Sequence, residues 1–236
     1  MKTTAIILTF LAQLLLPPSC AQQNNHMFKI PLKEPMSSGT EYPPIPFENL
    51  VLTPHYFLIH PEPDYSRQYG CDSIMKVQMM FNATIDDTEY PVYLQHYAIS
   101  DDQRLNIYPI ALHEYLIGME VTGATDRPQA TLTIEKNDFG KDFFLKEGQK
   151  AIIDGLTVQV DRATHEHASS GPNQPFVAIG VCDITLSDES GQKSFSFDSH
   201  EMEKKGWPAT EWGKYKVWIL NMYDRILKLK IEKKYF

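Results

Sequence analysis

The sequence predicts an all-β protein built from antiparallel β-sandwiches, with an immunoglobulin-like sandwich in its C-terminal part. From Asn49 onward, short runs rich in β-branched and aromatic residues alternate with turn residues, a spacing typical of antiparallel sandwiches. Turn signals such as Asp154-Gly155, Ser190-Gly191 and Tyr223-Asp224 separate neighbouring runs, and a two-residue Asp-Gly turn favours a hairpin. Helical patterns are weak, because only residues 111–117 and 199–207 could form a turn or two of helix.

The first 21 residues are typical of a signal peptide. Lys2 precedes an apolar stretch of 12 residues, Ala5 to Leu16, which only Thr9 and Gln13 interrupt. Such a stretch is too short to span a membrane and has the length of a signal h-region. Small residues at positions 19 and 21 allow ordinary cleavage after residue 21, which would release a secreted protein.

Cys20 offers a second processing route. The residues Leu16-Pro17-Pro18-Ser19-Cys20 resemble a bacterial lipoprotein box, in particular the relaxed versions found in Bacteroidetes. Two prolines stand where such boxes usually have small or aliphatic residues, and the resemblance covers these few residues only. It implies cleavage before Cys20, lipidation of its thiol, and an outer-membrane or cell-envelope lipoprotein whose partner is the membrane. We prefer this route because a polar, uncharged stretch follows at residues 22–25.

Residues 22–47 are predicted to be a tether, since they contain five prolines and no apolar period. A β-rich N-terminal part is then expected at residues 48–125 and the immunoglobulin-like sandwich at residues 126–236, with the boundary placed in GATDRPQA. The N-terminal part could form a second sandwich or an extra sheet on the same core. No internal repeat stands out in the sequence.

Charge limits the partners of the chain. The full sequence carries 22 basic and 30 acidic residues, for a net charge of −8, and removal of Lys2 with the signal peptide makes the mature chain one unit more acidic. A net-acidic chain argues against nucleic acid and against charge-driven binding to anionic lipid. The locally basic segment at residues 228–236 is expected to be an edge strand with lysines on its solvent face.

A His-x-His pair is the best candidate for a metal site. Residues two apart on a strand share a face, so His165 and His167 lie on the same side as Thr157, Gln159 and Asp161. The apolar residues between these positions are expected to face the core, which predicts that the two histidines are exposed. Both imidazoles could hold one metal ion, with His200 nominated as a third ligand. Because zinc sites need three or four convergent ligands, an exposed polar strand end is the preferred interpretation.

Two tryptophans flank a proline in the segment GWPATEWG. Trp207 and Trp212 could stack on a sugar or contact a protein partner. The alternative is that they cover the open end of the sandwich, because most large aromatic side chains serve packing.

Cys71 and Cys182 remain in the mature chain and could form a disulfide in an exported protein. Cys182 lies in an apolar run, however, and could equally be a buried small hydrophobe.

The sequence contains no GxSxG, HExxH, P-loop or dinucleotide fingerprint, so no cofactor is expected. We therefore expect an exported, lipid-anchored binding or structural module of the cell envelope without catalytic activity, with a protein or glycan ligand. A metal-binding protein or metalloenzyme and a carbohydrate-binding module are the alternatives.

Overall fold

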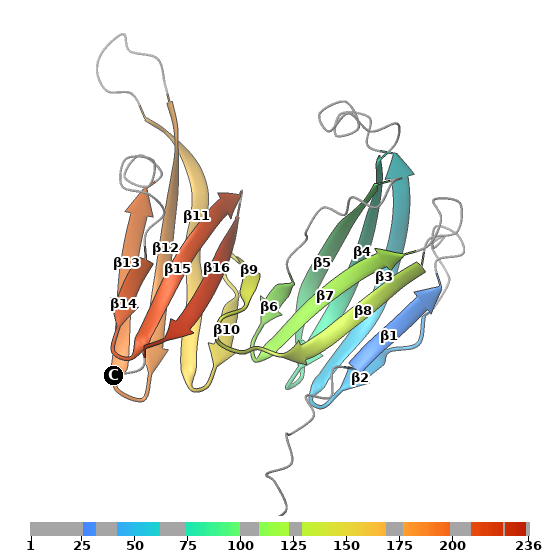
Figure 1. The fold of residues 1–236 in the computed structure, drawn as a ribbon, viewed down its shortest axis with the longest axis horizontal. Coiled ribbons are helices and arrows are strands. Elements are labelled where there is room, and N and C mark those ends of the chain that lie inside the picture. Colours follow the sequence, from blue (N-terminus) through green and yellow to red (C-terminus); the bar gives the residue numbers. More distant parts are fainter. Residues whose placement is uncertain are drawn as a thin grey trace, which may run out of the picture.

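The fold consists of two β-sandwich units that lie side by side (Figure 1). The computed structural model describes residues 26–31, 42–61, 74–99, 109–122, 129–168, 177–198, 209–223 and 225–234. Every strand in these ranges belongs to one of three sheets, which confirms the predicted all-β sandwich class. Within the same ranges, no helix has the length and apolarity needed to cross a membrane.

The N-terminal unit packs the strands β1-β8-β7-β6 against the sheet β2-β3-β4-β5, which lies behind β7 and β8 in Figure 1. One hydrophobic cluster fills the space between them, with Phe81 and Leu132 fully buried. Its strands are β1 (His26–Pro31), β2 (Ile45–Phe47), β3 (Leu50–Pro61), β4 (Ile74–Ile85), β5 (Thr88–Ile99), β6 (Ile110–Leu112), β7 (Tyr115–Thr122) and β8 (Gln129–Lys136).

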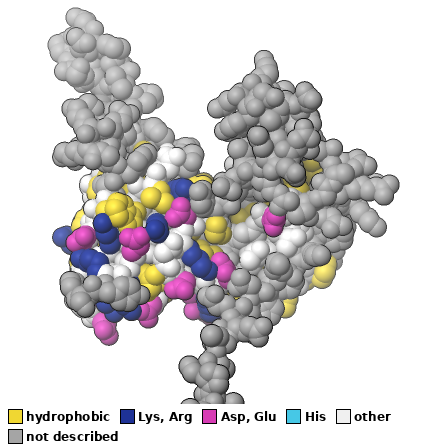
Figure 2. Space-filling model, viewed as in Figure 1, with side chains coloured by type: hydrophobic (Ala, Val, Ile, Leu, Met, Phe, Trp, Pro, Cys, Tyr) yellow, Lys and Arg dark blue, Asp and Glu magenta, His cyan; other side chains and the backbone are white. Residues whose placement is uncertain are grey.

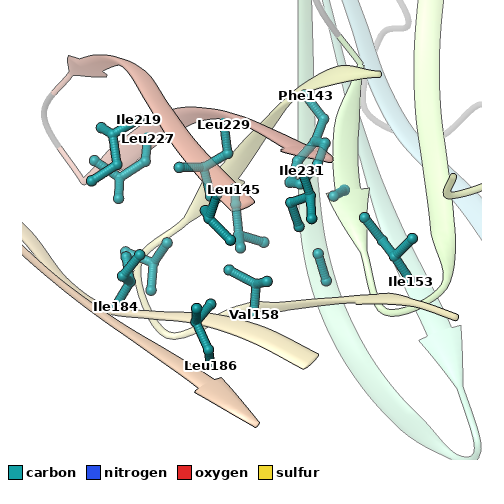
Figure 3. Packing of buried hydrophobic residues seen from close by; sticks show 14 of the residues in the cluster. Phe143, Leu145, Ile153, Val158, Ile184, Leu186, Ile219, Leu227, Leu229 and Ile231 are labelled. Atoms are coloured by element: carbon teal, nitrogen blue, oxygen red, sulfur yellow. The ribbon is translucent and has the colours of Figure 1, made fainter. Parts of the chain in front are cut away.

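The C-terminal unit packs the strands β9-β16-β15-β14 against the sheet β10-β11-β12-β13. Its own cluster lies between the two layers, where side chains such as Leu145 and Leu229 point toward Val158 and Ile184 of the opposite sheet (Figure 3). The strands are β9 (Asp142–Lys146), β10 (Lys150–Ile153), β11 (Leu156–Ala168), β12 (Val177–Asp188), β13 (Gly191–Asp198), β14 (Ala209–Trp212), β15 (Tyr215–Tyr223) and β16 (Ile226–Lys233).

The two units share one continuous eight-stranded sheet, because β6 pairs in parallel with β9. The Phe144 N–H donates to the Pro109 carbonyl at 2.8 Å, and the His113 N–H donates to the Lys150 carbonyl at 2.8 Å. Leu116 on β7 is buried in the C-terminal cluster rather than in its own unit's cluster. Backbone hydrogen bonds and apolar packing therefore both join the units.

Both units have the same topology, although the sequence shows no repeat. In each, one strand enters the shared sheet, four consecutive strands form the second sheet, and three strands return to the first. The resemblance extends to detail, since a β-bulge falls between Pro54 and Tyr56 in β3 and between Val160 and Arg162 in β11. Each bulge begins four residues after the first residue of its strand. A residue of one unit can therefore be matched to a residue of the other by its distance from the bulge and by its partner on the neighbouring strand.

The C-terminal unit has the two layers and the size of an immunoglobulin-like sandwich but a different strand order. An immunoglobulin constant domain distributes its strands over sheets ABED and CFG. Here β10 to β13 form a continuous meander instead.

Several finer expectations need correction. The segment predicted to be a tether contains β1, which pairs with β8 from His26 to Pro31, and β2; neighbouring prolines obscured these short strands in the sequence. The expected helical turn at 111–117 is the β6–β7 hairpin, whose turn residue His113 has a φ of 52°. The other expected helical segment, 199–207, lies outside the described residues.

The expected unit boundary also differs from the observed packing. Strand β8 falls within residues 126–236, the predicted C-terminal part, yet its residues Leu132 and Ile134 lie in the N-terminal cluster. The signal GATDRPQA thus falls between β7 and β8, and the change of core occurs between β8 and β9. Strand β16 is not an edge strand, because β9 and β15 flank it on both sides. Its alternation of lysines and apolar residues reflects one buried and one exposed face.

The predicted hairpin turns are present. Ile153 pairs with Leu156 around Asp154-Gly155, whose φ angles are 45° and 81°. Asp188 pairs with Gly191, and β15 pairs with β16 up to Ile226.

Candidate functional site

Several residues singled out from the sequence lie outside the described residues: Cys20, Cys71, His200 and Trp207. Their predicted roles in lipidation, disulfide formation, metal binding and ligand binding therefore stay predictions.

His165 and His167 lie on β11, opposite Gly180 and Ala178 of β12. Their predicted exposure depends on strict alternation of side chains from Leu156. The bulge at Val160/Arg162 breaks that alternation, and Ala163 just beyond it is buried. Alternation counted from Leu156 therefore does not hold beyond the bulge, because a bulge adds one residue to a strand and reverses which positions face the core. The exposure of the two histidines stays a prediction. The side chains of the two histidines are outside the described residues, so their metal site remains a hypothesis.

Trp212 ends β14 and is partly buried against the C-terminal cluster. Its ring lies 6.5 Å from that of Tyr215, and the two planes are tilted by 31°. This packing agrees with the alternative interpretation that Trp212 covers the end of the sandwich. Its predicted role in ligand binding has no structural support from these contacts.

Cys182 is a free thiol, fully buried in the C-terminal cluster. Burial, together with the nearby Asp183 carboxylate, raises the pKa of the thiol to about 12. Cys182 therefore behaves as a small apolar side chain, and the predicted bridge to Cys71 finds no support.

The surface that stands out is the outer face of the β3-β4-β5 sheet. We call it the tyrosine face and define it by Tyr56, Leu58, His60, Gln78, Met80 and Tyr93. These side chains face outward because their strand neighbours, such as Phe57, Val77 and Val92, are buried in the N-terminal cluster. The β3 bulge contributes as well, since it brings Tyr56 rather than His55 opposite Met80.

Exposed apolar side chains concentrate on this face. Among the described residues, the large hydrophobic side chains that are exposed are Leu58 at 38% and Tyr93 at 39%. Leu58 comes from β3 and Tyr93 from β5, on either side of β4. The middle of the face is the aromatic row, in which Tyr56 pairs with Met80 and Met80 pairs with Tyr93.

A hydrogen-bond network fixes the centre of the face. Gln78 is only 9% exposed, and its Nε2 donates to the Tyr93 hydroxyl. Its Oε1 lies 3.3 Å from His60 Nε2, which donates if that ring nitrogen carries the proton. The Tyr56 side chain also hydrogen bonds with that of Tyr93. Both ends of the Gln78 amide are thus engaged, which holds it in one orientation.

The geometry of the tyrosines follows from these bonds. Strands β3 and β5 are two strand spacings apart, about 10 Å. The hydroxyls of Tyr56 and Tyr93 nevertheless meet, so both rings must lean inward across β4 and over Met80. Two leaning rings form a low platform rather than two upright projections.

Burial raises the pKa of Tyr93 to about 12, and the hydroxyl of Tyr56 adds to the shift. Tyr93 is therefore neutral throughout the physiological range and keeps its capacity both to donate and to accept hydrogen bonds.

The C-terminal unit carries different residues at the positions equivalent to the aromatic row. Arg162 follows the β11 bulge as Tyr56 follows the β3 bulge, and it pairs with Asp183, which in turn pairs with Ser196. We call these three residues the polar row. Arg162 Nε donates to Asp183 Oδ2 at 2.7 Å, and Ser196 Oγ donates to Asp183 Oδ1. The same backbone thus accommodates charged and hydroxyl side chains at these three positions, so the topology does not require aromatic ones.

A second polar cluster lies at the β2–β3 turn of the N-terminal unit. Lys136 Nζ is 2.6 Å from Glu48 and 2.9 Å from Glu114, and lies 4.4 Å above the ring of Tyr115. The Tyr115 hydroxyl donates to Asn49 Oδ1. Burial alone would lower the pKa of Lys136, but hydrogen bonds with the two carboxylates and with Tyr115 raise it above its ordinary value.

This cluster has a counterpart in the C-terminal unit, which marks it as structural. Tyr215 is buried like Tyr115 and pairs with Lys233, which reaches Asp154 at 2.8 Å. Asp154 and Glu48 both occupy the first position of the equivalent two-residue turn, with φ angles of 45° and 54°. A Tyr-Lys-acid cluster present in both units serves the fold they share.

The outer face of β14 to β16 is mixed in charge, as Figure 2 shows for the C-terminal unit. Trp218 on this face lies under Lys216 Nζ at 3.9 Å and donates to Glu232 at 2.8 Å. Its ring and its N–H are thus both engaged by neighbours on the same sheet.

In the ranges that the structure describes, no group of three or more His, Cys, Asp or Glu side chains is placed to hold a metal ion. The tyrosine face is therefore the candidate site. The chain matches no protein-family model, no curated protein and no solved structure, so a function must be argued from this face.

Proposed function

We propose that the protein is a lipid-anchored module of the cell envelope that acts by binding rather than catalysis, and that its binding surface is the tyrosine face. The observation that carries the proposal is the exposure of Leu58 and Tyr93 beside a fixed hydrogen-bond network. Exposed apolar surface gives no folding energy. The polar row shows that the fold can be built without it.

Binding fits the chemistry of this face better than proton transfer does. A general acid or base works best with a pKa near the operating pH. The pKa of Tyr93 is raised to about 12, far from neutrality, and the Gln78 amide does not titrate. These groups suit recognition by hydrogen bonding.

A lipid on Cys20 would hold the N-terminal unit close to the membrane. Five residues, Ala21 to Asn25, separate Cys20 from the first residue of β1. Fully extended, they span at most about 18 Å. A lipid on Cys20 would therefore keep the N-terminal unit, which carries the tyrosine face, near the bilayer surface.

Anchoring is tested by detergent phase partition of the protein expressed in its native cells. We expect the wild type in the detergent phase and Cys20→Ala in the aqueous phase, because an acyl chain contributes about 0.8 kcal/mol per buried methylene. Ser19→Ala serves as the matched control. A mature N-terminus at Gln22 would refute the anchor.

Binding is tested by sedimentation of the full Cys20→Ala chain with envelope fragments from the native cells. We expect co-sedimentation that is lost when the aromatic row is replaced by the polar row, in the variant Y56R/M80D/Y93S. Equal sedimentation of both chains would contradict the proposed role of the tyrosine face.

A further inference from the structure

We propose that the tyrosine face binds an uncharged glycan chain, with sugar rings stacked on Tyr56 and Tyr93 and sugar hydroxyls bonded to the groups around Gln78. This inference rests on the proposed function, since it names the ligand class of the same surface. Charge, ring geometry, hydrogen-bonding groups and exposed area each support it.

The lack of charged side chains among the six residues of the tyrosine face favours a neutral ligand. None of the six residues of the tyrosine face is Asp, Glu, Lys or Arg, although the chain as a whole has a net charge of −8. Lys76, opposite His60 at the end of the face, is the one basic residue that the β3–β4 pairing brings to its border. Anionic ligands are usually held by clusters of Arg or Lys. The face has no such cluster. Further along the same side of the sheet, Glu89 accepts a hydrogen bond from Asn82 at 3.3 Å, so this single carboxylate is already bonded to a neighbour.

The orientation of the tyrosine rings favours a ligand with flat apolar surfaces. The rings of Tyr56 and Tyr93 lean across β4 over Met80, because their hydroxyls meet there. Tyr93 is 39% exposed and Tyr56 is half-buried, so part of each side chain is open to solvent in the middle of the sheet. A sugar ring has a face of C–H groups that can pack on such a platform, while its hydroxyls project around the edge.

The polar groups suit those hydroxyls. Tyrosine hydroxyls, the Gln78 amide and the His60 ring include both donors and acceptors. Gln95, paired with Gln78 on β5, adds another amide. Successive rows on one face lie about 6.8 Å apart along a strand, so neighbouring rows can engage successive parts of an extended chain. Because Gln78 is already fixed, little side-chain freedom remains to be lost on binding.

The exposed area argues for a glycan over a protein partner. An aromatic side chain offers roughly 200 Å², so Tyr93 at 39% exposure presents on the order of 80 Å². Leu58 adds a similar or smaller amount. The centre of a protein interface is apolar and fully buried, and two partly exposed side chains are too few to form one.

The test is electrophoresis of the purified full chain through native gels that contain a neutral polysaccharide. The probes are a β-glucan, a galactomannan and starch, with polygalacturonate as the anionic control. We expect at least one neutral probe to retard the wild type. Tyr93→Ala and Y56R/M80D/Y93S should weaken that binding at least tenfold.

Matched variants separate binding from folding. Trp218→Ala removes an aromatic ring from the opposite layer of the other unit and should leave retardation unchanged. Tyr93→Phe keeps the ring and should retain part of the affinity. The row replacement copies residues that the same backbone carries in the C-terminal unit, so it should fold even if Tyr93→Ala does not.

Three outcomes would overturn the inference: no retardation by any neutral probe, retardation by polygalacturonate alone, or retardation that the row replacement leaves intact. If the neutral probes fail while envelope sedimentation is still lost in the row replacement, the glycan class is wrong and the binding function stands. If sedimentation is also unaffected, both are wrong.

Discussion

The aromatic row and the polar row occupy equivalent positions in two units of the same topology, yet they differ in chemistry. In the C-terminal unit Asp183 is bonded to both of its neighbours, and every member of the row is polar. In the N-terminal unit the row is Tyr-Met-Tyr, and Tyr93 is 39% exposed. The polar row shows that the equivalent sheet of the C-terminal unit carries polar side chains at these positions, which supports the proposal that the aromatic row serves binding.

The Tyr-Lys-acid clusters, in contrast, are the same in both units. Lys136 with Glu48 and Lys233 with Asp154 stand at the same place in both units. A contact that recurs in both units is expected to stabilise the fold, and a contact confined to one is a candidate for function. The following predictions test this distinction, from the largest expected effect to the smallest.

The largest effect is expected from the matched core positions Leu132 and Leu229. Both are fully buried, and each lies four residues before the Lys of its own Tyr-Lys-acid cluster. Leu→Ala at either site should lower the free energy of unfolding by about 3 to 5 kcal/mol, through lost burial and the cavity left behind. Urea denaturation measures this. A cost below about 1 kcal/mol at one site would show that its unit lacks a tightly packed core.

Cys182 should be unreactive in the folded protein. Its pKa of about 12 leaves the thiol protonated below that pH, and only the thiolate is nucleophilic. In a Cys71→Ser chain, a disulfide reagent at pH 8 should label Cys182 only after unfolding. Rapid labelling of the native chain would contradict its burial.

The wild type purified from its own compartment tests the bridge separately. We expect titratable thiols after denaturation without reductant. Their complete absence would restore the Cys71–Cys182 disulfide.

Tyr115→Phe should destabilise the protein by about 1 kcal/mol. The substitution removes the hydroxyl that bonds Asn49 and lies 3.4 Å from Lys136 Nζ, while the buried ring remains. A typical intramolecular hydrogen bond contributes about this amount. Thermal unfolding at matched pH measures the change. An unchanged melting temperature would mean that the cluster is not a stabilising feature.

The double variant His165→Ala/His167→Ala tests the interpretation of the pair as an exposed polar strand end, which predicts the smallest effect, a stability change below about 0.5 kcal/mol. A larger loss of stability would show that these side chains face the core beyond the bulge. Metal content should be unchanged in elemental analysis. Stoichiometric zinc in the wild type that the variant loses would establish the metal site instead, and its affinity should then fall below about pH 6.5 as the imidazoles protonate.

The sequence predicted the strands, the sandwich class and turns such as Asp154-Gly155, because these depend on local pattern. It could not predict the bulge at Val160/Arg162, since the surrounding residues still alternate plausibly on either side of it. It also missed the tyrosine face. Tyr56 and Met80 are 24 residues apart in the chain, and only the long-range pairing of β3 with β4 brings them together. The shared topology was missed for the same reason, because it is a property of strand order.

Photo-crosslinking at two equivalent positions tests the central claim most directly. A benzophenone amino acid replaces Tyr93 in the aromatic row in one chain and Ser196 in the polar row in another, and each chain is irradiated in the native envelope. The account predicts a covalent adduct from position 93 and none from position 196, because only the tyrosine face binds. Adducts of equal yield at both positions, or at position 196 alone, would contradict it.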